Sequence, residues 1–223
     1  MIRHVAFIMD GNSTWAKKHN VSDLDGHLAG MKSLARLICK LKIPYATFYA
    51  FSTENWKRPK AWIDGFMKLA LRFLKTDPLV QEIFDVNVKL KIIGNRSLLP
   101  QSLQDIIKKY EELTKNSTGT LVQLAMSYGG RDEIIRAVKK LNNQNIEVNE
   151  ENLSKALDTA GVPDPDLIIR TSNKKRLSNF LLWQVSYSEF YSTDTLWPDF
   201  CIDDFNIAIA DFEKRSRTFG LSI

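Results

Sequence analysis

Apolar runs of strand length alternate with segments of helical period along this chain, and this alternation constrains the fold more than any other feature. The strand candidates span residues 5–9, 45–51, 86–93, 121–127 and 166–170, with a weaker one at 187–191. Apolar side chains recur at helical spacing through residues 31–38, 103–113, 134–141 and 205–212. Strands that alternate with amphipathic helices predict an α/β fold. We therefore predict a single domain over residues 1–223, with a mostly parallel six-stranded sheet flanked by helices.

Composition narrows the choice of partner only slightly. The 31 basic and 26 acidic residues leave a formal net charge of +5, which suits nucleic acid, a phosphorylated metabolite or the inner membrane surface. No apolar run approaches the roughly 18 residues of a membrane span. Cys39 and Cys201 form no metal or disulfide spacing, which favours two core thiols in a reducing compartment. These features predict a cytoplasmic protein.

Polar residues follow four of the predicted strands, at residues 10–12, 52–56, 128–131 and 170–172. In sheets of this class, ligands bind beyond the carboxyl ends of the strands, which share one edge. We therefore expect the functional site at that edge.

Asp10 ends the first apolar run, where a carboxylate needs a partner to offset the loss of water. A helix that starts near Ser13 would direct backbone N–H groups at an anion. Mg²⁺ is usually held by one or two carboxylates plus phosphate oxygens, so a metal–diphosphate facing Asp10 is one interpretation. The simpler interpretation is that Asp10 caps the helix, and this stretch alone favours it.

The segment at residues 51–59 combines hydrogen-bonding groups with a large apolar surface. Ser52, Asn55 and Arg58 supply the polar groups, and Trp56 supplies the surface. A turn that caps a helix beginning near Pro59 is an alternative, but it leaves Trp56 and Arg58 unexplained.

A basic segment follows the fifth predicted strand. Arg170, Lys174, Lys175 and Arg176 fall within seven residues, and guanidinium groups bind phosphate oxygens in pairs. A solvated basic loop is the common alternative. The cluster lacks interleaved aromatic residues and no recognition-helix motif appears, so no nucleic-acid partner is expected. His27 is the one histidine expected in an active site.

Eight segments, taken in order, resemble the cis-prenyltransferases, the family that includes bacterial undecaprenyl diphosphate synthases. They read HVAFIMDGN, GHLAG, YAFSTENWKRP, SYGGRDEI, PDLIIRTS, RLSNFLLWQ, YSEFY and LWPDF, and they span nearly the whole chain. Each segment is weak alone, but the ordered set is highly specific. The resemblance implies a homodimeric α/β enzyme that uses Mg²⁺ to extend farnesyl diphosphate with isopentenyl diphosphate units. Because the extended prenyl product is strongly apolar, the resemblance also implies transient association with the membrane surface.

The resemblance also implies roles for individual residues. The catalytic and allylic diphosphate positions fall on Asp10, with a metal, and on Gly11, Asn12, Ser13, Thr14 and Trp15. The central active-site positions are His27, Ser52, Asn55, Trp56 and Arg58. The isopentenyl diphosphate head group would contact Arg170, Arg176 and Ser178. Glu189 would serve metal binding and the dimer contact, and residues 215–220 would reach the partner's site.

Two departures from the family pattern affect the allylic diphosphate site. Thr14 stands where the family has an arginine, and a second family arginine corresponds to Asp23. Each lost charge-assisted hydrogen bond is worth roughly 1.5–3 kcal/mol. We favour an active synthase with an altered allylic site, whose product is the undecaprenyl carrier lipid of cell-wall peptidoglycan synthesis. The alternatives are a different primer or product length, a non-catalytic partner subunit of a heteromeric enzyme, and an unrelated phosphate-binding α/β protein.

Overall fold

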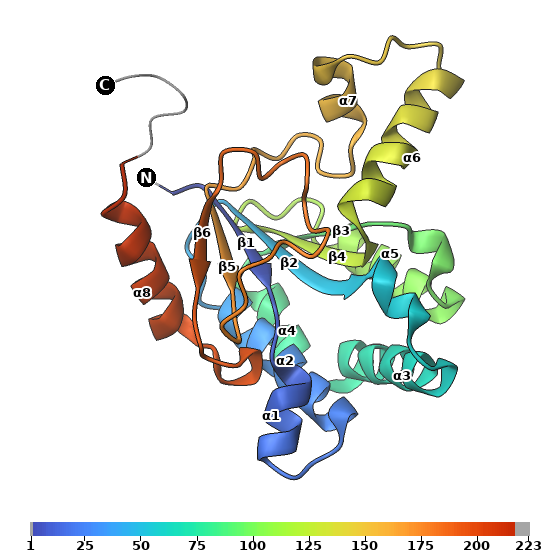
Figure 1. The fold of residues 1–223 in the computed structure, drawn as a ribbon. Coiled ribbons are helices and arrows are strands. Elements are labelled where there is room, and N and C mark those ends of the chain that lie inside the picture. Colours follow the sequence, from blue (N-terminus) through green and yellow to red (C-terminus); the bar gives the residue numbers. More distant parts are fainter. Residues whose placement is uncertain (1, 217–223) are drawn as a thin grey trace.

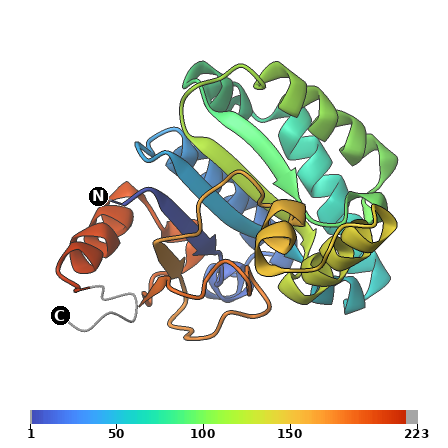
Figure 2. The ribbon, with the colours of Figure 1, turned by 90° about the horizontal axis from the view of Figure 1, so that it is seen from above.

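The computed structural model describes residues 2–216 of the chain. Its strands form one all-parallel, six-stranded sheet in the order β3-β4-β2-β1-β5-β6 (Figures 1 and 2). The strands are β1 His4–Ile8, β2 Tyr45–Ser52, β3 Lys89–Ile93, β4 Leu121–Tyr128, β5 Leu167–Arg170 and β6 Glu189–Ser192. The predicted α/β class and the six-stranded parallel sheet are therefore confirmed.

Helices cover both faces of this sheet. The α-helices of the described region are α1 Asn12–Lys18, α2 Asp23–Ile38, α3 Lys60–Thr76, α4 Pro78–Asp85, α5 Gln101–Leu113, α6 Gly130–Asn143, α7 Glu150–Ala156 and α8 Ile202–Glu213. Three 3₁₀ helices join them, η1 Thr53–Lys57, η2 Arg96–Leu98 and η3 Trp197–Asp199. The core clusters place α2, α3, α4, α5 and α8 against one face of the central strands. On the other face, the segment at residues 177–181 packs against the strands, and α6 packs against α7 (Figure 1).

Burial on both faces explains the unbroken apolar run that begins the chain. All five residues of β1 are buried. Phe7 stacks on Phe48 with ring centroids 4.5 Å apart and faces α2, whereas Ala6 and Ile8 face the opposite cluster. A parallel sheet that is covered on both sides selects such continuous apolar strands.

Strand β3 begins three residues later than the sequence predicts. Asn87 adopts a left-handed φ of 58°, which belongs to a turn and not to a strand, so residues 86–88 complete the turn after α4. The other predicted strands differ from the observed ones by at most two residues at either end. None of the described helices is both long enough and apolar enough to cross a membrane.

Candidate active site

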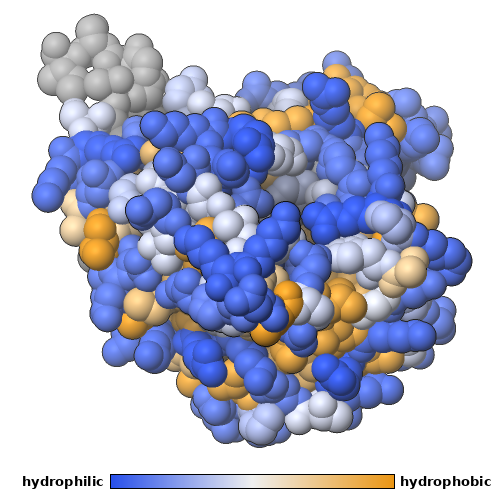
Figure 3. All heavy atoms as spheres, turned by 60° about the horizontal axis from the view of Figure 1, so that its bottom comes forward, coloured by the Kyte–Doolittle hydropathy of each residue, from blue (hydrophilic) through white to orange (hydrophobic). Residues whose placement is uncertain are grey.

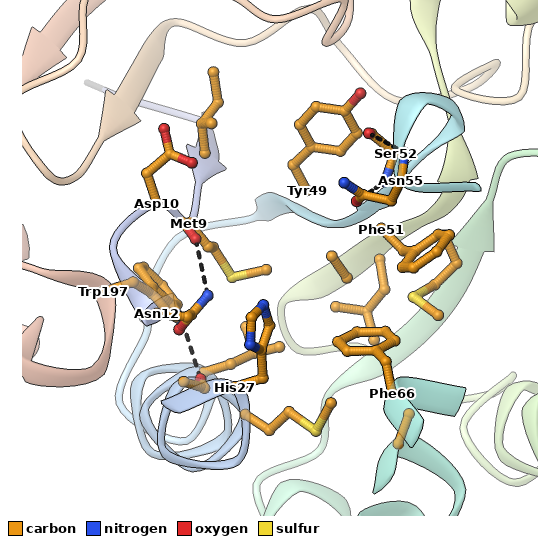
Figure 4. Close-up of a pocket in the computed structure, with 18 of the residues that line it drawn as sticks. Met9, Asp10, Asn12, His27, Tyr49, Phe51, Ser52, Asn55, Phe66 and Trp197 are labelled. Carbon is orange, nitrogen blue, oxygen red and sulfur yellow. Dashed lines mark hydrogen bonds between the residues drawn. The ribbon is translucent and has the colours of Figure 1, made fainter. Parts of the chain in front are cut away.

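A cavity of about 910 Å³ opens at the carboxyl edge of the sheet, where β1, β2 and β5 end. Polar side chains from the loops after these strands line one end, and apolar side chains from α2, α3 and α5 line the interior (Figure 4). On the side of the molecule that carries α1 and α3, apolar patches lie among hydrophilic side chains (Figure 3). The cavity therefore lies at the edge where the sequence predicts the functional site.

Most of the predicted site residues line this cavity. They are Asp10, Gly11, Asn12, Ser13, Thr14, His27, Ser52, Asn55, Arg58, Arg170, Arg176 and Ser178. Four predicted residues do not line it: Trp15, Asp23, Trp56 and Glu189.

Trp15 and Trp56 make contacts elsewhere. The Trp15 indole donates to Asp199 Oδ1 at 2.7 Å and stacks on His19. Trp56 donates to Ser127 Oγ at 2.9 Å and packs edge-on against Phe51 in the cluster under α3 and α5. Both side chains thus support the site from outside the cavity wall.

Asp10 is paired with Arg170. Nε and Nη2 of Arg170 donate to Oδ2 of Asp10 at 2.9 and 2.5 Å. The same guanidinium donates through Nη1 to Ser178 Oγ at 3.0 Å and to the carbonyl of Arg176. The two functional segments that the sequence places 160 residues apart therefore meet in one charged network.

The turn after β1 is fixed by its backbone. The Asp10 carbonyl accepts hydrogen bonds from Thr171 Oγ1 at 2.6 Å and from Trp197 N at 3.0 Å. Gly11 has a left-handed φ of 113°, and a Cβ there would approach Leu196 to 3.0 Å. Glycine is therefore required at this turn, and α1 begins directly after it at Asn12.

His27 faces the cavity from α2 (Figure 4). Its Nδ1 donates to the Asp23 carbonyl at 2.7 Å, so the neutral ring carries its lone pair on Nε2. Burial lowers the pKa of His27, which favours the neutral form.

The Asp23 carboxylate binds a tryptophan side chain. Its Oδ2 accepts from Trp62 Nε1 at 2.6 Å, and the Arg58 guanidinium lies 4.0 Å from the centre of the Trp62 ring. Burial opposes ionisation of Asp23, but hydrogen bonds from Ser13 and Trp62 lower its pKa. The carboxylate thus orients Trp62, and Trp62 supports Arg58 at the polar end of the cavity.

Ser52 and Asn55 cap η1 reciprocally. Asn55 N donates to Ser52 Oγ at 3.3 Å, and Ser52 N donates to Asn55 Oδ1 at 2.9 Å. The capping alternative is therefore correct for these two residues, although the helix they cap is η1 and α3 begins later, at Lys60. Both residues also line the cavity, so capping and a functional role are compatible.

Comparison with known proteins decides the family. The family model described as "Putative undecaprenyl diphosphate synthase" matches residues 8–220. The chain belongs to this prenyltransferase family. An isoprenyl transferase of Treponema denticola is 45% identical, over 98% of this chain and 97% of that protein. An isoprenyl transferase of Bacillus cereus is 44% identical, over 97% of this chain and 87% of that protein.

Two solved structures share the fold of this prenyltransferase. The lavandulyl diphosphate synthase of Lavandula x intermedia, in complex with dimethylallyl diphosphate, superposes with a TM-score of 0.90 at 36% identity, over 98% of each chain. A probable undecaprenyl diphosphate synthase of Campylobacter jejuni gives a TM-score of 0.81 at 41% identity, over 99% of each chain. The chain is therefore an enzyme that transfers prenyl groups.

The polar end of this prenyltransferase's cavity fits a metal–diphosphate better than a metal ion alone. Both hydrogen bonds from Arg170 use Oδ2 of Asp10, which leaves Oδ1 for a cation. Within residues 2–216, no group of three or more His, Cys, Asp or Glu side chains is arranged to hold a metal. Magnesium bound at Asp10 would therefore take further ligands from a diphosphate, as it commonly does.

Glu189 lies at the other edge of the sheet. It opens β6 in register with Leu167, the first residue of β5, whereas Asp10 follows the end of β1. Its carboxylate accepts from Arg215 Nη1 at 2.9 Å. Within the described residues of one chain, Glu189 therefore lies apart from Asp10, and its expected role in metal binding stays a prediction. Residues 217–220 of the C-terminal motif lie outside the described residues.

Glu54 and Asn179 are two of the polar cavity residues of this prenyltransferase that the sequence analysis did not select as site residues. They line the polar end and are hydrogen-bonded to each other at 2.8 Å. Each lies directly beside a residue that the sequence did single out, Asn55 and Ser178. A partner 125 residues away leaves no local signal in the sequence.

Proposed function

We propose that this prenyltransferase condenses isopentenyl diphosphate onto farnesyl diphosphate and repeats the step to make a long-chain polyprenyl diphosphate, the undecaprenyl carrier lipid. The observation that carries the proposal is one continuous cavity with a charged end and an apolar interior. Its volume of about 910 Å³ is near the upper end of the roughly 300–1,000 Å³ of ordinary ligand pockets, which suits a long hydrocarbon.

The polar end offers two sets of phosphate-binding groups. Asp10, Ser13 and Thr14 follow β1, and we assign them to the allylic diphosphate. Arg176 and Ser178 follow β5, and we assign them to isopentenyl diphosphate. Arg170 lies between the two sets because it bonds both Asp10 and Ser178.

The reaction breaks the allylic C–O bond, and the departing diphosphate takes the electron pair. The double bond of isopentenyl diphosphate attacks the allylic carbon, and a proton then leaves the new five-carbon unit. Negative charge grows on the departing diphosphate, so donors that are already oriented toward it lower the barrier. Asn12 and the hydroxyls of Ser13 and Thr14 would donate hydrogen bonds to this group, and Asp10 would hold the Mg²⁺ whose charge would offset that of the diphosphate.

The apolar interior excludes water from the allylic carbon. Phe66 and Trp62 of α3 stack on each other, and His27 packs edge-on against both rings. We assign this aromatic group to the wall beside the first isoprene units. Water is a competing nucleophile for an allylic cation, and its exclusion favours condensation over hydrolysis.

The remaining features of the proposal concern assembly and location. We propose a cytoplasmic homodimer that contacts the membrane surface transiently, because its product is strongly apolar. Glu189, at the edge strand β6, is the residue that we assign to the dimer contact. Glu189 would then contribute to a metal site of the partner subunit and not to that of its own chain.

A different primer is the second candidate, and Thr14 and Asp23 favour it because they replace two cationic groups at the allylic site. The test is incubation of the purified chain with Mg²⁺, labelled isopentenyl diphosphate and, separately, farnesyl, geranyl or dimethylallyl diphosphate. Long labelled chains from farnesyl diphosphate support the proposal. Products from the shorter primers only would establish the second candidate instead.

A further inference from the structure

Three polar segments at the carboxyl edge of the sheet meet at Asn179. Its Nδ2 donates to Glu54 Oε1 at 2.8 Å, and its Oδ1 accepts from Arg131 N at 3.0 Å. Its backbone carbonyl accepts from Gly130 N at 2.7 Å. Glu54 belongs to η1 after β2, and Gly130 and Arg131 begin α6 after β4. Asn179 therefore connects the loop after β5 to the segments that follow two other strands.

The local sequence is suited to this junction. Asn179 has a left-handed φ of 65°, a conformation that asparagine tolerates better than most residues. A Cβ on Gly129 would lie 2.5 Å from Thr53 Oγ1 and 2.6 Å from Asn179 Nδ2. Glycine at position 129 therefore permits the close approach of the two loops.

The contact between Asn179 and Glu54 is charge-assisted. Burial opposes ionisation of Glu54, but hydrogen bonds led by that from Asn179 lower its pKa. Thr53 Oγ1 donates to the second carboxylate oxygen at 3.2 Å. Hydrogen bonds to an ionised acceptor are shorter and stronger than neutral ones.

The junction lies between two groups of cavity residues. On one side, η1 carries Ser52 and Asn55, and on the other, the loop after β5 carries Arg176 and Ser178. In the proposed function, on which this inference rests, Arg176 and Ser178 bind isopentenyl diphosphate, and η1 forms the neighbouring part of the cavity wall.

We propose that the Asn179–Glu54 hydrogen bond positions these two loops relative to each other and thereby controls the condensation step more than the binding of either substrate. The reacting carbons must approach to roughly 3–3.5 Å with aligned orbitals. A small displacement of η1 against the loop after β5 spoils that alignment, while Ser13 and Thr14 after β1 and Arg176 and Ser178 after β5 keep their contacts with the two diphosphates. Both residues are thus positioning residues.

Three variants isolate this contact. Asn179→Gly keeps the left-handed backbone and the carbonyl bond to Gly130 while it removes the side chain, and with it both the donor to Glu54 and the acceptor of Arg131 N. Glu54→Ala removes the acceptor, and Glu54→Gln restores an acceptor oxygen without charge. Glu151→Ala is the matched control, because it breaks an exposed ion pair with Lys155 on α7, far along the chain from the junction.

The measurement is kcat and the KM of each substrate, taken with whichever of the three primers the parent enzyme uses best. Glu54→Ala and Asn179→Gly are expected to lower kcat about 10- to 100-fold, with each KM within about threefold of the parent's. The double variant is expected to be about as slow as the slower single one, because the two residues form one contact. Glu54→Gln should recover most of the lost rate, and Glu151→Ala should match the parent.

Unchanged kcat in both single variants would overturn the inference, as would losses that multiply in the double variant. A raised KM with unchanged kcat would also overturn it, since that pattern indicates a binding role. All variants are assayed with the primer that the parent enzyme uses best. The test therefore remains valid even if that primer is not farnesyl diphosphate. Circular dichroism checks folding, and Asn179→Gly and Glu54→Gln carry the test if Glu54→Ala does not fold.

Discussion

Arg170 reaches Asp10 from inside the protein, and two of its nitrogens donate to one carboxylate oxygen. The Arg170 side chain is 2% exposed, whereas that of Asp10 is 38% exposed at the cavity. A buried guanidinium needs a charged partner, so this aspartate stabilises the fold as well as lining the site. The carboxylate at the end of β1 therefore has its partner in the chain itself, and its second oxygen is left for a cation.

Replacing Asp10 separates these two roles. Asp10→Ala leaves Arg170 with two neutral acceptors, the Arg176 carbonyl and Ser178 Oγ, and should cost about 1–3 kcal/mol of unfolding free energy. Asp10→Asn keeps an acceptor oxygen and should cost less. Both variants should lose at least about 100-fold in kcat, because only the charged carboxylate would hold the cation that offsets the charge on the departing diphosphate. Urea unfolding and the product assay measure the two effects, and parental turnover in Asp10→Asn would contradict the assigned role.

A cation at position 14 should strengthen the allylic site. Thr14 lines the mouth of the cavity, so Thr14→Arg can reach a diphosphate there. One charge-assisted hydrogen bond corresponds to a KM for the allylic diphosphate about tenfold lower. Thr14→Gln, which adds length without charge, is the control and should leave the KM near the parental value. Equal effects of the two variants would show that charge at this position is irrelevant.

A cation at position 23, in contrast, should not strengthen the allylic site and should destabilise the fold. Asp23→Arg removes the acceptor of Trp62 Nε1 and sets a positive charge beside Arg58. The variant should lose about 1 kcal/mol of stability and gain no affinity for the allylic diphosphate. Asp23→Asn, which keeps an acceptor oxygen, should stay near the parent in stability. An Asp23→Arg enzyme that binds the allylic diphosphate tighter would show that Trp62 can release this residue freely.

A larger side chain in the cavity interior should shorten the product. Ala70 on α3 lines the apolar part and is buried, so Ala70→Leu reduces the space for hydrocarbon. The first condensation should proceed at a near-parental rate, because the polar end is unchanged. Chromatography of labelled products should show a longest chain that is shorter by at least one isoprene unit. An unchanged product distribution would mean that the chain grows along another route.

His4 should make stability depend on pH. It is buried in β1, donates from Nδ1 to the Pro163 carbonyl at 2.6 Å, and burial lowers its pKa to about 4. The unfolded chain, with a histidine pKa near 6.5, takes up a proton that the folded chain does not. Stability should therefore rise with pH between about 4 and 6.5.

Between pH 5 and pH 7.5, His4 should increase the free energy of unfolding by about 2 kcal/mol. Urea unfolding at these two pH values measures it, and His4→Gln should lose that part of the difference. The comparison of the two chains is needed because burial raises the pKa of Glu133, which gives a slope of the opposite sign. An identical pH dependence in His4→Gln would contradict the assignment.

The fold could be predicted because its strands are buried on both faces. β1 is apolar from Val5 to Ile8 and contrasts clearly with the amphipathic period of α2. The start of β3 was mispredicted because the apolar Val86 and Val88 continue the pattern of the strand, while Asn87 between them forms a turn. A turn formed by a single residue within an apolar run is difficult to predict from the sequence.

The candidate site could be predicted only as a set of positions. Asp10, Ser52 and Arg170 lie at the ends of parallel strands, and topology alone brings them to one edge. Which side chains pair there depends on contacts between distant segments. The Asp23–Trp62 hydrogen bond shows this, because it joins two residues that are 39 positions apart in the chain.

The central claim is that one cavity holds an allylic diphosphate at Asp10 and its hydrocarbon between α2 and α3. The most direct measurement is a crystal structure of the chain with Mg²⁺, isopentenyl diphosphate and a thiolo analogue of farnesyl diphosphate that cannot ionise. We predict the allylic diphosphate and its cation beside Asp10, and the isopentenyl head group at Arg176 and Ser178. A diphosphate bound away from Asp10, or a hydrocarbon outside the cavity, would contradict the account.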